Sequence, residues 1–107
     1  MKESEWKKSR KLREICLERF CERVLQEAER ICNSDNQSAH QRYGNLYGLM
    51  LDRDEELANA FDYPKRSKAF FQLMLMYRLK LIADKELDEF EDETTNAIRE
   101  IVDRGNE

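Results

Sequence analysis

The sequence has little proline, glycine or histidine, with one Pro, three Gly and one His among 107 residues. Sheets joined by tight turns need more of the residues that bend a chain, so this composition is typical of long helices exposed to solvent. None of the three glycines follows a predicted strand, which argues against a glycine-rich phosphate loop. The single His40 has Gln37 three residues before it, so the Glu-x-x-His pairs of di-iron bundles are absent.

Cysteine is scarce as well, and Cys16, Cys21 and Cys32 all fall within one predicted helix. An odd number of cysteines cannot all pair internally as a secreted disulfide framework does. Their side chains also point in different directions around the helix, so they cannot converge on one metal ion. We therefore expect reduced thiols, no metal site and no cofactor.

No long hydrophobic run is present. Residues 1–11 are polar and charged, without the apolar segment of a signal peptide. The longest apolar stretch, in the second half of the chain, is too short and too interrupted to cross a bilayer, which needs about 20 residues. These absences predict a soluble, cytoplasmic protein with no membrane partner.

That apolar stretch, residues 69–82, is the feature around which we predict the fold. It has only three polar residues, and at about 100° per residue they leave no single face of a helix for water. The three are Gln72, Arg78 and Lys80. Because Pro64 suits the first position of a helix, we predict a buried central helix over about 64–82.

The first helix, predicted from about Ser4 to Cys32, is too long for a bundle of this size. A helix of 29 residues extends about 43 Å, whereas a globule of this chain length has a radius of gyration of about 13 Å. We therefore expect residues 1–13 to fray, to project as a basic helical arm or to lie on a second copy. Trp6 falls beyond the expected core, and a large aromatic there favours docking on another chain.

A turn at residues 33–38 precedes the second helix, with Ser34 or Asp35 as its predicted cap. We expect this helix to bury its apolar side chains. Those side chains are Tyr43, Leu46, Tyr47 and Met50.

Two further features lie on this second helix. The charged run at residues 52–56 predicts a kink or short break near Asp52, followed by a turn that buries Phe61. Gly44 and Gly48 are predicted to pack closely against the central helix, with a self-association face as the alternative.

The chain after the central helix predicts two more helices. Asp84 can cap a short one that buries Leu87 and Phe90. A last helix starts at Asp92, Thr94 or Thr95 and ends at Gly105, and it is predicted to bury Ala97, Ile98, Ile101 and Val102. The predicted fold class is therefore all-α, with residues 1–107 forming a single domain that is a compact bundle of five or six helices.

Charge is distributed unevenly along the chain. Residues 1–13 carry six Lys/Arg against two Glu, whereas residues 84–107 carry three Lys/Arg against ten Asp/Glu. Either the two ends attract each other within or between chains, or one end binds an external partner.

We find no catalytic constellation and no small-molecule substrate in the sequence, so we do not expect an enzyme. We expect the protein to act through contacts with other proteins, as a homodimeric interaction or regulatory module. Two partner classes other than self remain open. The candidate partner interface consists of Trp6, Leu12, Ile15, Met74 and Met76.

The first alternative is a regulator that contacts nucleic-acid phosphates through the basic first helix, although an acidic chain is a poor binder of polyanions. Its candidate contacts are Lys7, Lys8, Arg10, Lys11 and Arg13, and a second basic cluster is Lys65-Arg66-Lys68. The other alternative is an acidic inhibitor or immunity-type antagonist of a basic protein. Its candidate surface is Asp88, Glu89, Glu91 and Asp92.

Overall fold

The computed structural model describes residues 1–105, and within that range it contains five α-helices, one 3-10 turn and no strand. The predicted all-α class is confirmed, and a short helix and a last helix are present near the C-terminus. The cap of the short helix is Ala83 and not Asp84, which is its first helical residue, and Ile101 of the last helix is 39% exposed instead of buried. The elements are α1 (Glu3–Cys32), α2 (Ala39–Phe61), η1 (Arg66–Lys68), α3 (Ala69–Arg78), α4 (Asp84–Leu87) and α5 (Asp92–Gly105).

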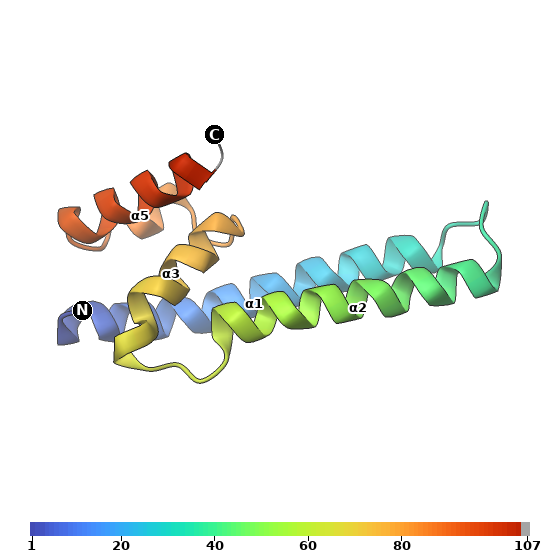
Figure 1. Ribbon diagram of the computed structural model, residues 1–107, viewed down its shortest axis with the longest axis horizontal. Coiled ribbons are helices and arrows are strands. Elements are labelled where there is room, and N and C mark those ends of the chain that lie inside the picture. The colour runs from blue at the N-terminus through green and yellow to red at the C-terminus, as the bar shows by residue number, and fades with distance from the viewer. Residues whose placement is uncertain (106–107) are drawn as a thin grey trace.

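The two long helices α1 and α2 lie antiparallel as a hairpin, and the shorter helices pack at one end of it (Figure 1). This is the end that holds the N-terminus, because α2 brings the chain back beside the first half of α1 before α3 begins. The loop between α1 and α2 lies at the opposite end. The hairpin makes the molecule long, with extents of 51 × 30 × 20 Å and a radius of gyration of 16.3 Å.

The core sits where all the helices meet. Phe20 of α1 and Phe61 of α2 pack with ring centroids 5.8 Å apart. Leu73, Leu87 and Ile98 from the three shorter helices are fully buried around them. The hydrophobic effect therefore acts mainly at this end of the hairpin.

The central apolar stretch is largely buried as predicted, except for Phe71, which is 54% exposed. The helix is also shorter than 64–82. It begins with a 3-10 turn at Arg66 and ends at Arg78. Lys80 has a φ of 61°, and the next amide, of Leu81, donates to the Met76 carbonyl at 3.0 Å. This left-handed residue and the bond from residue 81 back to residue 76 form a Schellman motif, which ends a helix.

Two arginines of α1 explain why the chain leaves the helix there without exposing its carbonyls. Arg23 donates to the carbonyls of Leu79 and Lys80 at 2.6 and 3.0 Å, and Arg19 donates to that of Leu81 at 2.8 Å. Leu81 itself stays buried although it is not helical. The carbonyls that a longer helix would satisfy internally are satisfied by α1 instead.

Two predictions for α2 are wrong. Its cap is Ser38 and not Ser34 or Asp35, because Ser38 and Gln41 exchange bonds between side chain and backbone at 2.9 and 3.1 Å, which makes a capping box. The helix also runs through Asp52 without a break. The charged run does not interrupt it, since Arg53 pairs with Glu27 of α1 at 3.5 Å and so fastens α2 to its neighbour.

The first turns of α1 are helical from Glu3 and pack on the bundle, in place of the projecting or frayed arm expected for residues 1–13. Glu5, Ser9 and Leu12 are buried there. The part of α1 that extends past the bundle is its C-terminal end, from residue 25 onward. The reason is topological, since α3 to α5 follow the end of α2, which lies beside the N-terminal half of α1.

Candidate protein interface

The outer half of the hairpin buries no side chain well. From Leu25 to Asn59, which covers the end of α1 from residue 25, the loop and most of α2, no residue falls in the buried class. The remaining helices pack at the other end (Figure 1), so the outer half consists of two helices that cover only each other. Two helices alone cannot enclose a core, and apolar side chains therefore remain at the surface.

Several of these side chains are large. Tyr43 is 70% exposed, Tyr47 61%, Met50 49% and Leu51 56%. Because they recur at spacings of four, three and one, they lie within about 100° of the helix circumference. We call these four residues the hairpin face. The prediction that Tyr43, Tyr47 and Met50 point into the core is wrong, because no third element covers this part of α2.

The segment of α2 that carries the hairpin face is almost uncharged. Residues 36–51 contain one formally charged residue, Arg42, in a chain that is 39% charged. Arg42 donates to the Cys32 carbonyl at 2.7 Å, where its charge complements the C-terminus of α1. Aromatic and Met side chains without neighbouring charge are characteristic of the centre of protein interfaces.

Gly44 and Gly48 lie beside this face and do not pack against α3. A Cβ built on either residue meets no other atom within 4 Å. The prediction of close packing against the central helix is therefore wrong, and the alternative of a contact between chains is left. The absence of side chains at both positions lets another helix approach the α2 backbone.

The structure places the sequence-predicted interface residues elsewhere. Leu12, Met74 and Met76 are buried in the core of the chain itself. Trp6 is half-buried, with the Arg10 guanidinium 5.3 Å from its ring centroid, and only Ile15 is exposed. The sequence signal that would have found the hairpin face instead is the long uncharged segment at 36–51.

The basic residues of the first helix are partly engaged within the chain. Lys8 donates to the Glu89 carbonyl at 2.9 Å, and Arg13 donates to the Phe61 carbonyl at 2.7 Å. Lys7, Arg10 and Lys11 are exposed. This group therefore serves first to join α1 to the segments that pack on it.

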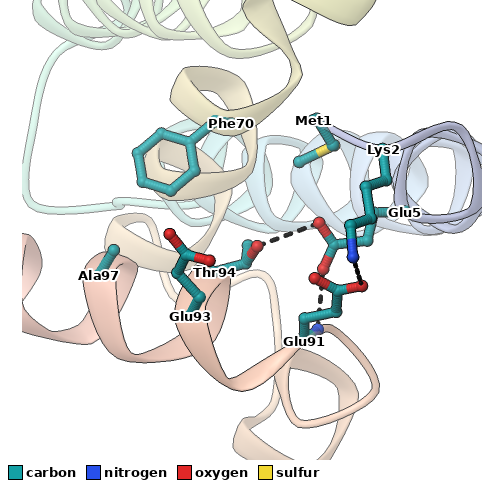
Figure 2. Close-up of a pocket in the computed structure, with 8 residues that line it drawn as sticks. All are labelled: Met1, Lys2, Glu5, Phe70, Glu91, Glu93, Thr94 and Ala97. Atoms are coloured by element: carbon teal, nitrogen blue, oxygen red, sulfur yellow. Dashed lines mark hydrogen bonds and ion pairs between the residues drawn. The ribbon is translucent and has the colours of Figure 1, made fainter.

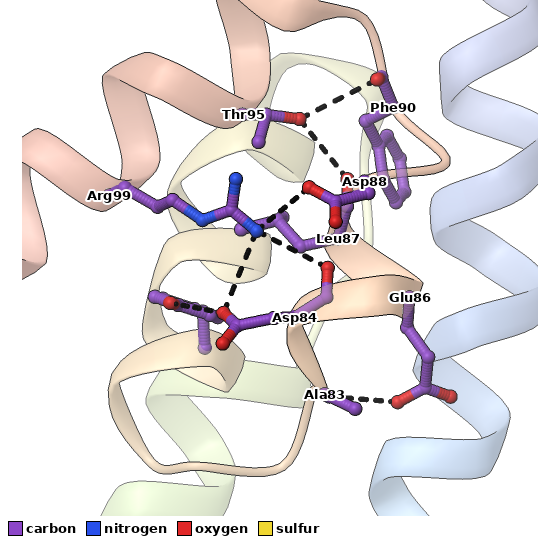
Figure 3. A network of polar contacts seen from close by, with 9 residues as sticks. Ala83, Asp84, Glu86, Leu87, Asp88, Phe90, Thr95 and Arg99 are labelled. Carbon is purple, nitrogen blue, oxygen red and sulfur yellow. Dashed lines mark hydrogen bonds and ion pairs between the residues drawn. The ribbon is translucent and has the colours of Figure 1, made fainter.

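The candidate acidic surface is engaged in the same way. Asp88 pairs with Arg99 at 2.8 Å in a network that also ties Asp84 to α5 (Figure 3). Glu91 pairs with Lys2 at 2.9 Å. Glu89 and Asp92 are exposed. The basic and acidic ends of the chain thus contact each other, as one of the two readings of the charge pattern predicted.

A pocket of about 390 Å³ lies between the N-terminus and α5 (Figure 2). Its wall contains Glu5, which is only 4% exposed. One Glu5 carboxylate oxygen accepts from the Glu91 amide at 2.8 Å and the other accepts from the Thr94 hydroxyl at 3.0 Å. Since both oxygens are bonded, Glu5 acts as a cap on the N-terminus of α5 contributed from a distant part of the chain.

The side chains that could bind a metal form no metal site in the described part of the chain. Among residues 1–105, no three side chains of the metal-binding types come together. Cys16 is fully buried, and this burial raises the pKa of its thiol to about 11. Cys32 is exposed near the hairpin loop. In the same range, no helix combines the length and hydrophobicity needed to cross a membrane.

Comparisons with protein-family models, with curated proteins and with solved structures found no match to this chain. The fold and the hairpin face therefore have to be interpreted from their own physical properties.

Proposed function

We propose that this protein is a cytoplasmic interaction module that pairs with a second copy of itself through the hairpin face. One observation carries the proposal: 35 consecutive residues, Leu25 to Asn59, bury no side chain well, yet expose two tyrosines, a methionine and two leucines. Exposed apolar area of this kind on a small protein marks a binding surface. The cytoplasm fits the three free thiols.

Charge favours a second copy as the occupant. In a two-fold symmetric contact a surface meets itself, so any net charge at its centre would repel its own image. The hairpin face avoids this repulsion, because Arg42 is the one formally charged residue in 36–51. Pairing also covers Tyr43 and Tyr47, whose hydroxyl groups can still reach water at the rim.

Charge also favours an antiparallel arrangement of the two α2 helices. The acidic run at 52–56, which has four carboxylates and Arg53, stands at one end of the hairpin face, and Arg42 stands at the other. Parallel helices would bring two acidic runs together. Antiparallel helices place each acidic run beside the basic end of the partner, so attraction replaces repulsion.

We assign the protein a binding role and not a catalytic one, because the proposed face consists of apolar side chains. Gly44 and Gly48 suit close contact between two helices. The close approach forms van der Waals contacts that larger side chains at these two positions would prevent.

Light scattering after size exclusion at high micromolar concentration tests the proposal. We expect twice the monomer mass of 12.9 kDa, and we expect Tyr47→Glu to restore the monomer, because it buries an unpaired charge at the contact. Tyr63→Glu is the matched control, since Tyr63 is equally exposed at the other end of the molecule. A wild-type chain that stays monomeric, or a dimer that Tyr47→Glu leaves intact, would overturn the proposal.

The orientation has its own test. His40 and Asp54 fall on the same side of α2 as Tyr47, at spacings of seven residues. In a Cys32→Ser background, we expect His40→Cys and Asp54→Cys to cross-link with each other when mixed, and neither to cross-link efficiently alone. Cross-links between two copies of one variant would indicate parallel helices.

A further inference from the structure

A second surface lies at the opposite end of the molecule, around the loop from α2 to α3 (Figure 1). From Pro64 to Ala83 the chain has five Lys/Arg and no Asp/Glu, although the whole chain has a net charge of −4. Lys65, Arg66 and Lys68 within this segment are exposed. A local excess of positive charge in an acidic protein selects anionic ligands for this one place.

An exposed aromatic ring lies beside one of these cations. Tyr63 is 78% exposed, the highest value among the large apolar and aromatic side chains of the described chain. Its backbone φ is 49°, which is rare for a bulky residue. The Lys68 ammonium lies 5.9 Å from the ring centroid. The fold therefore holds a flat apolar surface and a positive charge side by side in the solvent.

The first helix extends this surface. Trp6, Arg10, Arg13 and Pro64 line one shallow depression, so the loop lies directly against α1. Arg10 stacks 5.3 Å from the Trp6 ring centroid, which repeats the pairing of a cation with an aromatic ring. Arg13 and Arg66 are committed to the carbonyls of Phe61 and Met1.

We propose that this basic-aromatic patch, formed by Trp6, Arg10, Tyr63, Lys65 and Lys68, binds a short stretch of single-stranded nucleic acid. Unpaired bases stack on aromatic side chains while cations contact the phosphates between them. A duplex keeps its bases stacked inside and offers Tyr63 no ring face. An acidic peptide is held by charge and needs no aromatic ring, so exposed Tyr63 and half-buried Trp6 favour a nucleic acid over an acidic peptide.

The patch predicts how binding depends on salt. The three cations of the patch, Arg10, Lys65 and Lys68, are exposed and can reach phosphates. Three phosphate contacts with a single strand give a slope of about −2 in log K against log salt, so affinity falls roughly 20-fold between 50 and 200 mM.

The experiment is fluorescence anisotropy of a labelled 12-mer of oligo(dT) and of oligo(U) with the full chain at both salt concentrations. We expect Tyr63→Ala to weaken binding by about tenfold or more through lost stacking, and Tyr63→Phe to bind as the wild type does. Tyr43→Ala is the matched control, because it removes an equally exposed tyrosine from the hairpin face. Circular dichroism verifies that each variant is folded.

The charge arm compares Lys65→Glu/Lys68→Glu with Arg30→Glu/Lys85→Glu, which makes the same change in net charge at exposed positions elsewhere. Only the first pair is expected to abolish binding at 200 mM salt. No binding at 50 mM, or equal losses from both pairs, would overturn the proposal. Binding of a poly-glutamate peptide with the same dependence on Tyr63 would do so too, and would assign the patch to an acidic protein. None of these outcomes depends on the hairpin face.

Discussion

Replacing Glu5 tests whether a single buried carboxylate joins the two ends of the chain. Glu5→Ala removes both acceptors and leaves the Glu91 amide and the Thr94 hydroxyl without their partner in a site that is 4% exposed. An unsatisfied buried donor costs about 1–3 kcal/mol, and the Thr94 hydroxyl can turn toward the pocket and its water. We therefore expect the free energy of unfolding to fall by about 2–3 kcal/mol.

Glu5→Gln separates hydrogen bonding from charge. The Gln carbonyl can still accept from the Glu91 amide, and the rotatable Thr94 hydroxyl can accept from the Gln amide. What is lost is the negative charge at the N-terminus of α5, which contributes about 0.5–1 kcal/mol. We expect Glu5→Gln to be destabilised by about 1 kcal/mol, clearly less than Glu5→Ala.

Urea unfolding followed by circular dichroism measures both effects, with Glu3→Ala as the control because Glu3 is exposed in the same helical turn. A double-mutant cycle with Thr94→Ala should show coupling of about 1 kcal/mol. If Glu5→Ala costs no more than Glu3→Ala, then Glu5 does not act as the cap that its geometry indicates, and the docking of α1 on α5 rests on other contacts.

Two further predictions concern single residues. Lys80→Gly should raise the free energy of unfolding by about 1 kcal/mol, because glycine adopts the left-handed conformation at φ 61° without strain. Lys80→Ala should leave the free energy of unfolding unchanged. Equal urea midpoints for the two variants would contradict this prediction. Cys32 should react with a thiol reagent at pH 8 while Cys16 reacts only on unfolding, because Cys16 is buried and its thiol pKa is raised to about 11. Mass spectrometry after a short pulse of reagent identifies the labelled residue. Early labelling of Cys16 would contradict the prediction and would show that the core opens locally.

The sequence predicts what is periodic and apolar with success. The long first helix, the burial of the central stretch and the burial of Leu87 and Ile98 all follow from spacing and composition. The prediction of Ser34 or Asp35 as the cap of α2 was wrong, but the sequence does contain the right signal, because Ser38 and Gln41 have the spacing of a capping box. These features depend on neighbours within a few residues, which a sequence contains.

What the sequence misses depends on contacts between distant segments. The end of α3 is set by Arg19 and Arg23, which lie more than fifty residues earlier, and Lys80 carries no glycine-like signal for the left-handed turn. The prediction that Tyr43 and Tyr47 are buried failed for the same reason. Their spacing shows that they share one side of α2, but it does not say whether another helix covers that side.

The lack of a core in the outer hairpin has a consequence for stability as well as for binding. Helices of this kind gain most of their stability from tertiary packing, and residues 25–59 have little of it. Their hydrogen bonds should therefore open more readily than those at the other end of the hairpin, where Phe20 and Phe61 are buried. Association through the hairpin face would add the missing packing to the closed state alone, so it would stabilise this part in proportion to the logarithm of protein concentration. If pairing supplies the packing that the outer hairpin lacks in a single chain, the low charge of residues 36–51 has a physical reason, because this segment would then lie inside the contact.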